Sequence, residues 1–246
     1  MDFRRLTFLR SGLLAVQKVA NSFGFQLVYQ HVSGIPDAEL YRPMFQPWRS
    51  PAWGAKLNIG DSRSLLTPEA KYYFYFLATE AARRSSGSVA ECGVYRGGTA
   101  KILSNIFPDR ELLLFDTFQG MPETDAIKDL HRKGDFADTS LEQVKAYVGA
   151  RDNGNVTFVP GLIPETLAPY SGRTFCFVHV DLDIYGAIRS ACEFFYPRLE
   201  PGGIMLFDDY GFPSCPGARL AVDEFFADKS VSPMVLSTGQ CFVTVR

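Results

Sequence analysis

Two aspartates, Asp181 and Asp183, follow an apolar run in the segment CFVHVDLDIYG at residues 176–186. The run is typical of a buried strand, and a charge is costly in an apolar interior unless something pairs with it. Another apolar run ends in LFDDYG, where Asp208 and Asp209 stand side by side. Carboxylates at strand ends bind a cation, act as a base or cap a turn, and the surrounding elements determine which role is open to them.

Short apolar segments alternate with amphipathic ones along most of the chain. The pattern predicts helices at 67–84, 99–107, 141–148, 185–196 and 218–227, and strands at 89–94, 112–115, 156–159, 174–180 and 204–207. Thr67 before Pro68 indicates a helix start, and Ser140 with Gln143 indicates a capping box. Strands that alternate with helices in this way predict a parallel sheet covered on both faces.

The C-terminal segment PMVLSTGQCFVTVR predicts instead two strands joined by a turn at residues 238–240. A mostly parallel α/β sheet that ends in an antiparallel hairpin is the Rossmann-like layout of a class I methyltransferase. Such sheets bind ligands beyond the carboxyl ends of their strands, where the strand order reverses. The strands that end at Asp181 and at Asp208 are neighbours in this layout, so Asp181, Asp208 and Asp209 are expected to meet at one edge.

Three carboxylates packed together are unfavourable unless a cation neutralises them. An all-oxygen set without cysteine or histidine suits a hard divalent ion, Mg²⁺ before Ca²⁺ or Mn²⁺, and suits zinc poorly. If the chain stays extended that far, strand alternation places Asp183 on the same side as Asp181, so that one can bind the metal while Asp183 remains free as a general base for an acceptor hydroxyl. His179 in the same strand is the alternative base, although a single histidine in an apolar strand is more often a core residue.

The cofactor prediction comes from the ends of the first two strands. In ECGVYRGGTA, Gly93, Gly97 and Gly98 allow a tight turn close to a ligand, but their spacing is not the G-x-G-x-x-G of pyrophosphate loops. Glu91, inside the strand, calls for a cationic partner such as the amino group of a bound amino acid. Asp116 ends the second strand, where nucleotide sites place an acid that binds both ribose hydroxyls. Because no P-loop is present, the combination favours S-adenosylmethionine.

Several motifs in register resemble one family. The segments ECGVYRGGTA, LLLFDTFQGMP, DTSLEQV, VHVDLDIY, LEPGGIMLFDDYG and ARLAVDEFF, within about residues 64–229, are similar to the macrocin O-methyltransferase family of metal-dependent antibiotic sugar O-methyltransferases. The resemblance implies a multimer whose N-terminal segment helps to close the site. It implies S-adenosylmethionine at Glu91, Gly93, Tyr95 and Asp116, with Ser140 near the adenosine, Mg²⁺ on Asp181, Asp208 and Asp209, and Asp183 as base toward a sugar hydroxyl.

Two other functions share part of this pattern. A catechol-type O-methyltransferase has the same fold and metal chemistry, but resemblance to that family calls for a lysine where this chain has Ile184. A non-catalytic module that binds S-adenosylmethionine is the other alternative. Such a module does not require four aspartates at the sheet edge, so the enzyme is the favoured hypothesis.

Composition indicates which binding partners and which compartment suit this chain. The 246 residues are 46% hydrophobic, and 25 Lys and Arg against 27 Asp and Glu give a net charge of −2, which offers no positive field for nucleic acid. The cysteine number is odd, at five, without a C-x-x-C pair, which favours reduced thiols in a cytoplasmic protein. No apolar run approaches the roughly 20 residues of a membrane-spanning helix, so a soluble protein is expected.

The N-terminal region, residues 1–66, is expected to precede a methyltransferase domain at 67–246. Its apolar stretch GLLAV is too short for a signal peptide. Residues 31–66 are rich in proline, glycine and aromatics without a period, which favours an irregular lid or interface arm. A helix is expected before it, packed on the body or on a second subunit, with weak membrane contact as the alternative; its apolar face consists of Leu6, Leu9, Leu13, Val16 and Ala20.

Overall fold

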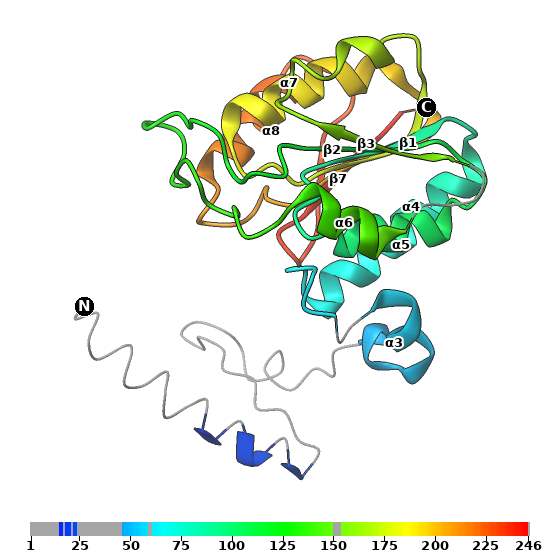
Figure 1. Cartoon of the computed structure of the whole chain (residues 1–246), viewed down its shortest axis with the longest axis vertical. Coiled ribbons are helices and arrows are strands. Elements are labelled where there is room, and N and C mark those ends of the chain that lie inside the picture. The colour runs from blue at the N-terminus through cyan, green and yellow to red at the C-terminus, as the bar shows by residue number, and fades with distance from the viewer. Residues whose placement is uncertain are drawn as a thin grey trace. The chain divides into compact units, whose positions relative to one another are not determined.

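The computed structural model describes residues 15–16, 18–20, 22–23, 46–58, 61–149 and 154–245 (Figure 1). Residues 1–45 and 46–246 form two compact units, and each is described by itself. In the first unit, residues 15–16, 18–20 and 22 are helical. The other positions of the expected N-terminal helix face, and residues 31–45 of the expected arm, lie outside the described residues.

The segment 46–66 belongs to the second unit and is more regular than expected. It contains a 3₁₀ helix, η1 (Pro47–Arg49), and helix α3 (Pro51–Leu57). Both helices begin on a proline, whose fixed backbone angle suits the first turn of a helix. Pro47 and Pro51, whose presence favours irregular backbone in the sequence, are therefore the first residues of helices.

Seven strands form one sheet in the order β3-β2-β1-β4-β5-β7-β6. Their bounds are β1 Ser88–Cys92, β2 Leu112–Asp116, β3 Val156–Pro160, β4 Phe175–Val180, β5 Leu199–Phe207, β6 Met234–Val235 and β7 Cys241–Thr244. The first five strands run parallel, whereas β7 is antiparallel to both β5 and β6. The predicted fold class, with its C-terminal antiparallel hairpin, is confirmed.

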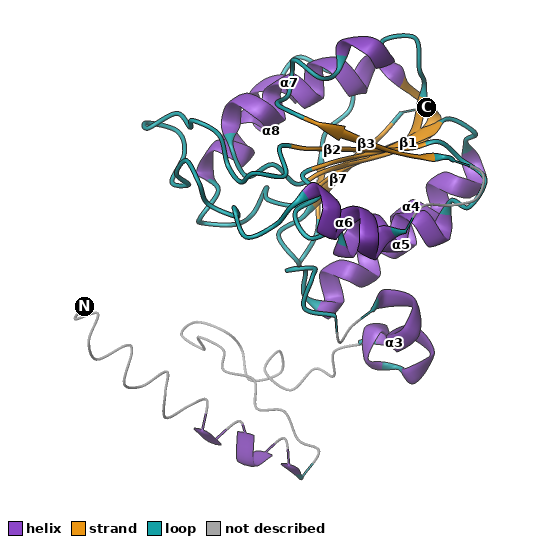
Figure 2. Ribbon diagram, viewed as in Figure 1, coloured by secondary structure: helices purple, strands orange, loops and turns teal. Residues whose placement is uncertain are grey.

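Helices cover both faces of the sheet (Figures 1 and 2). One face carries α4 (Pro68–Arg84), α5 (Gly98–Ile106) and α6 (Leu141–Val148), and the other carries α7 (Tyr185–Phe195) and α8 (Pro216–Phe226). The strands serve both layers because successive side chains point to opposite faces. In β2, Leu113 and Phe115 pack in the core under α7 and α8, while Leu112 and Leu114 pack in the core under α4 and α5.

Local sequence signals explain most element bounds. The hydroxyl of Thr67 accepts the Ala70 amide at 3.2 Å, and the hydroxyl of Ser140 accepts the Gln143 amide at 3.3 Å, so the predicted caps of α4 and α6 are confirmed. Strand β5 begins at Leu199, five residues before the predicted start at 204. The Pro-Gly-Gly that follows Glu200 interrupts the pairing with β4, because Leu199 lies opposite Phe175 and the regular register resumes only at Ile204. Gly202 has a left-handed φ of +79° at this irregularity.

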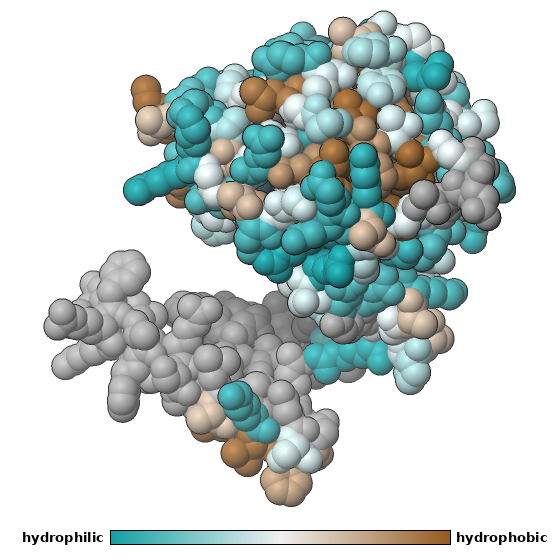
Figure 3. Space-filling model, viewed as in Figure 1, coloured by the Kyte–Doolittle hydropathy of each residue, from teal (hydrophilic) through white to brown (hydrophobic). Residues whose placement is uncertain are grey.

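Cysteines, helix hydropathy and surface composition bear on the general character of the chain. All five cysteines are free and buried. Within the described part of the chain, no helix combines the length and hydropathy that crossing a membrane requires. On the face of the second unit that Figure 3 shows, apolar side chains are scattered among polar ones.

Glu200 gives the fold a specific response to acid. Its carboxylate accepts hydrogen bonds from the hydroxyls of Ser85 and Thr174 and from two backbone amides, which lower the pKa of Glu200 to about 2. Since this pKa lies below its ordinary 4.5, the stabilisation is present above pH 4.5 and is lost as the pH falls toward 2.

Glu200→Gln should lower the melting temperature at pH 7 and flatten its decline below pH 4.5. The exposed Glu165→Gln should leave the melting curve between pH 7 and pH 2 unchanged.

Candidate active site

A cavity of about 380 Å³ opens at the carboxyl ends of the parallel strands, a volume in the range of small-molecule sites. The strand order reverses between β1 and β4, so the cavity lies where sheets of this type bind ligands. The walls include most of the predicted site residues, namely Gly93, Tyr95, Asp116, Asp181, Asp183, Asp208 and Asp209. Glu91 and Ser140 are not among the lining residues.

Gly93 allows β1 to turn directly beside β4. Its φ is +89°, and a Cβ at this position would lie 1.6 Å from the carbonyl oxygen of Asp181. The chain therefore leaves β1 at Cys92, two residues before the predicted end of the strand. The close approach of the two backbones brings the loop after β1 and the acidic end of β4 to the same cavity.

Gly93→Ala should destabilise the fold strongly, by about 3 kcal/mol or more, because a left-handed backbone and a collision with fixed backbone add together. Gly134 offers a matched control, since its φ is also +89° but nothing lies within 4 Å of an added Cβ. Gly134→Ala should cost only about 1 kcal/mol of backbone strain. Urea unfolding of both variants measures the difference, and equal free energies of unfolding would contradict the assigned contact.

Asp116 holds the loop that follows β1. Its Oδ2 accepts the amides of Val94 at 2.7 Å and Tyr95 at 2.8 Å, and its Oδ1 accepts the amide of Phe118 at 2.7 Å. A carboxylate has about four lone-pair positions, and the fourth here faces only the Thr117 hydroxyl, a long contact at 3.5 Å that a ligand hydroxyl can replace. Asp116 therefore caps the turns that follow β1 and β2 and leaves fewer acceptor positions than two ribose hydroxyls would use, so its contact with a ribose stays a prediction.

Tyr95 and Ser140 differ in their relation to the cavity. Tyr95 lines it with a left-handed φ of +49°, and its hydroxyl donates to Asp138 at 2.7 Å. Ser140 caps α6 through its side chain, while its neighbour Thr139 lines the cavity and donates its hydroxyl to the Tyr95 carbonyl at 2.7 Å. The proximity of Ser140 to an adenosine stays a prediction.

Glu91 and His179 form a buried ion pair on neighbouring strands. Both side chains are fully buried, and His179 Nδ1 lies 3.0 Å from Glu91 Oε1. The other ring nitrogen lies 3.9 Å from Asp208 Oδ1, an ion-pair distance too long for a hydrogen bond. Burial lowers the pKa of His179, but the carboxylates of Asp208 and Glu91 outweigh burial and raise it to about 9.

The ion pair bears on the predicted roles of His179 as a base and of Glu91 as a cofactor-binding residue. The raised pKa of His179 favours its protonated form, and the side chain does not line the cavity, so His179 is badly placed as the alternative base. Glu91 has the cationic partner that the sequence called for, but within the protein. A direct contact of Glu91 with a cofactor stays a prediction, and Oε2, the Glu91 oxygen without a hydrogen-bond partner among the described residues, is the atom that would make it.

Asp181, Asp208 and Asp209 come together as predicted. One carboxylate oxygen of each lies within 4.8 Å of the others, and Asp208 and Asp209 are only 7% and 5% exposed. Burial and then the neighbouring carboxylates raise the pKa of Asp181 and Asp209 well above the ordinary range. Gln240, which the sequence did not single out, donates to Asp208 at 2.7 Å. The oxygen-only cluster fits a hard divalent cation, which would relieve this repulsion.

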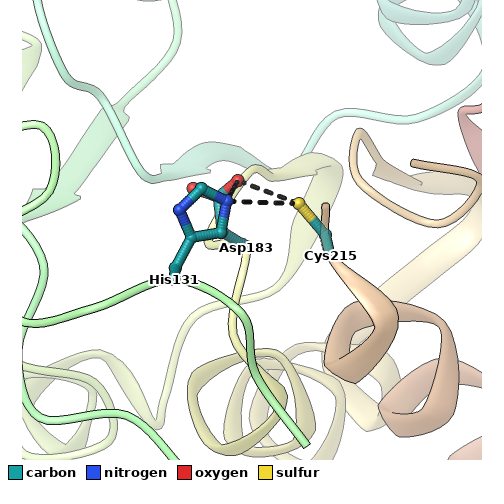
Figure 4. A group of neighbouring side chains, drawn as sticks. All are labelled: His131, Asp183 and Cys215. Atoms are coloured by element: carbon teal, nitrogen blue, oxygen red, sulfur yellow. Dashed lines mark hydrogen bonds and ion pairs between the residues drawn. The ribbon is translucent and has the colours of Figure 1, made fainter. Parts of the chain in front are cut away.

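Asp183 lies beside this cluster in a distinct environment. Its φ is +60°, and its amide donates to Asp209 at 2.9 Å, which turns the side chain into the cavity. Its Oδ1 accepts the Cys215 thiol at 3.3 Å and lies 3.6 Å from His131 Nε2 (Figure 4). Burial raises the pKa of Asp183, while His131 opposes the increase.

Sequence reasoning missed His131 and Cys215. His131 lies in the loop between β2 and α6, and Cys215 is the N-cap residue of α8, 84 positions away. Neither belongs to a metal or nucleophile motif, so no sequence signal connected them. Asp129 anchors the loop, since its Oδ1 accepts the Tyr185 amide at 2.9 Å at the start of α7.

The comparison with protein families decides the family. The family model described as macrocin-O-methyltransferase (TylF) matches residues 77–243, which include almost the whole sheet. The chain belongs to this family. The resemblance inferred from the sequence motifs is therefore confirmed, and the fold agrees with it.

Two curated methyltransferases are similar to this chain. Mycinamicin III 3''-O-methyltransferase of Micromonospora griseorubida is 34% identical, over 56% of this chain and 60% of that protein. Demethyldecarbamoylnovobiocin O-methyltransferase of Streptomyces niveus is 28% identical, over 61% and 62%. The chain thus spans about three fifths of the length of these curated relatives.

Solved structures agree with this family. The O-methyltransferase NovP superposes with a TM-score of 0.63 at 25% identity, covering 74% of this chain and 83% of that chain. The calicheamicin methyltransferase CalS11 gives a TM-score of 0.60 at 19% identity, covering 82% of this chain and 98% of that chain. The latter similarity supports the fold.

Proposed function

We propose that this protein is an S-adenosylmethionine-dependent O-methyltransferase that acts on a sugar hydroxyl with the help of Mg²⁺. The observation that carries the proposal is the position of Asp183, a cavity-lining carboxylate beside the cluster of Asp181, Asp208 and Asp209, in a chain of the macrocin-O-methyltransferase family. The names of two relatives support a sugar acceptor. They are the mycinamicin III 3''-O-methyltransferase and a 4'-O-methyltransferase of a rhamnosyl tetracenomycin from Streptomyces olivaceus.

Gly93, Tyr95 and Asp116 would hold the cofactor. Gly93 and Tyr95 line the cavity with backbone that Asp116 fixes, and Asp116 keeps an acceptor position for a ligand hydroxyl. Glu91, through its Oε2 atom, and Ser140, near the adenosine, also belong to the proposed cofactor site, although neither lines the cavity. When bound, S-adenosylmethionine supplies a methyl group activated by its sulfonium.

Asp183 would accept the proton of the acceptor hydroxyl. Burial raises its pKa, which makes this carboxylate a stronger base than an exposed aspartate. Asp181, Asp208 and Asp209 would hold Mg²⁺, whose charge, when bound, makes a nearby hydroxyl more acidic. The polar partners of these side chains, Gln240 among them, keep the acidic edge oriented.

The setting of the enzyme is part of the proposal. Five free and buried cysteines support a reducing compartment, which we take to be the cytoplasm. The acceptor is a small glycoside or sugar, and neither nucleic acid nor a membrane is required. A homo-oligomer in which residues 1–66 help to close the cavity completes the proposal.

Isothermal titration with S-adenosylmethionine, with and without Mg²⁺, tests the first step. Incubation with a panel of glycosides and nucleotide sugars, followed by mass spectrometry of the products, tests the second. We expect cofactor binding and methylation of a sugar hydroxyl that stops when the divalent cation is chelated. Absence of cofactor binding would overturn the enzyme, and methylation of phenols alone would favour the catechol-type alternative.

A further inference from the structure

A separate set of metal-ligating atoms lies in the same cavity wall. His131 Nε2 and Cys215 Sγ are 3.6 Å apart, His131 Nε2 and Asp183 Oδ1 are 3.6 Å apart, and Cys215 Sγ and Asp183 Oδ1 are 3.3 Å apart (Figure 4). The three side chains come from the β2–α6 loop, from the end of β4 and from the start of α8. Figure 4 shows them directed toward one another.

The triangle of these atoms has the size of one face of a zinc tetrahedron. Zinc bonds of about 2.3 Å to sulfur and about 2.0–2.2 Å to nitrogen and oxygen, at tetrahedral angles, separate the ligand atoms by roughly 3.3–3.6 Å. The three separations in the structure, 3.3 Å from sulfur to oxygen and 3.6 Å for the two pairs that include His131 Nε2, fall in this range. An ion could therefore bind without large movement of the backbone.

The imidazole of His131 is oriented for this role by its other nitrogen. Nδ1 lies 3.1 Å from Asp135 Oδ2, and the same carboxylate oxygen accepts the Arg132 amide at 3.0 Å. A carboxylate that accepts from one ring nitrogen fixes the tautomer in which the other nitrogen has a free lone pair, an arrangement common around histidines that bind metals. The lone pair of Nε2 then faces Asp183 and Cys215.

The donor set differs in chemistry from the neighbouring aspartate cluster. One nitrogen, one oxygen and one sulfur suit zinc and other borderline or soft ions, whereas three carboxylates suit Mg²⁺. Cys215 is 3% exposed, while the side chains of His131 and Asp183 are 19% and 17% exposed, because they face the cavity. All three residues line the cavity, so a fourth ligand of a bound ion would come from the cavity side, as in zinc sites that exchange a ligand.

We propose that His131, Asp183 and Cys215 form a second metal site, selective for Zn²⁺, next to the Mg²⁺ cluster. On binding, the Cys215 thiol releases its proton to the solvent, and the thiolate becomes a ligand. The consequence rests on the proposed function: Asp183 bound to zinc has lost its capacity as a base, so zinc inhibits methyl transfer. The rate of methyl transfer then depends on the concentration of free zinc.

Co²⁺ is the direct probe of this site, because a thiolate bound to cobalt gives a charge-transfer absorption in the near ultraviolet. The full-length protein is titrated with Co²⁺ in excess Mg²⁺, and Zn²⁺ affinity is measured by competition. We expect the band in the native protein and in Asp181→Asn, which alters only the aspartate cluster. The band should disappear in Cys215→Ser. Zn²⁺ should bind about 10-fold more weakly to Asp135→Asn, which loses the orienting carboxylate.

Each possible result has a defined meaning. A native protein without the band, or a band that Cys215→Ser retains, overturns the site. His131→Gln, at a partly exposed loop residue, provides a further variant if Cys215→Ser does not fold by circular dichroism. The ratio of methylation with and without Zn²⁺ in each variant tests inhibition. A cobalt band in a protein that methylates no acceptor supports the metal site and contradicts the proposed methyltransferase activity. Methylation without a cobalt band supports the activity and contradicts the metal site.

Discussion

Asp183→Asn is expected to lower the kcat of methyl transfer by about 10³-fold, within the 10²–10⁴-fold that general bases contribute. The amide that replaces the carboxylate cannot accept the hydroxyl proton. The affinity for S-adenosylmethionine should stay within about twofold, because Asp116, Gly93 and Tyr95 are unchanged. Initial rates with an acceptor glycoside that the native protein methylates, and isothermal titration of the cofactor, measure the two quantities.

Asparagine is the matched substitution at this position. Asp183 has a φ of +60°, a left-handed conformation that asparagine tolerates nearly as well as aspartate. The amide of residue 183 can still donate to Asp209. Asp228→Asn, at an exposed carboxylate paired with Lys229, serves as control and should keep full activity. A kcat of Asp183→Asn equal to that of the control would assign the base to another residue.

Asp181→Asn should increase the stability of the metal-free protein and decrease the stability of the Mg²⁺-bound protein. Burial and the charges of Asp208 and Asp209 raise the pKa of Asp181 well above its ordinary value, so its ionised form opposes folding. Without metal, the variant should be more stable by about 1 kcal/mol, or about 2–4 °C in a chain of this size. The gain should increase with pH, because a raised folded-state pKa gives stability at low pH that is lost as the carboxyl ionises.

With Mg²⁺ the order should reverse. A cation at 100 times its dissociation constant stabilises the native protein by about 2.7 kcal/mol, and a cluster with one fewer charged ligand binds it at least about tenfold more weakly. Thermal melts at several Mg²⁺ concentrations and pH values measure both effects. Glu193→Gln, at an exposed side chain paired with Arg189, is the control. If Mg²⁺ leaves the melting temperature of the native protein unchanged, the cation site is contradicted.

The sequence by itself determined the architecture and the acidic edge of this protein. Alternation of apolar strands with amphipathic helices is a local property, and parallel strands place their carboxyl ends together whatever their side chains are. Asp181, Asp208 and Asp209 could therefore be assigned to one edge from their positions at strand ends. The caps at Thr67 and Ser140 are equally local, since donor and acceptor lie three residues apart.

Only the tertiary structure decided which side chains meet across elements. Glu91 pairs with His179 because β1 and β4 are neighbours in a register that places these two residues opposite each other. His131 reaches Asp183 and Cys215 because a loop without periodicity folds back over the strand ends. Such contacts depend on the path of irregular backbone, which the spacing of residues along the chain does not encode, so the metal-ligating triad emerges only when the whole chain has folded.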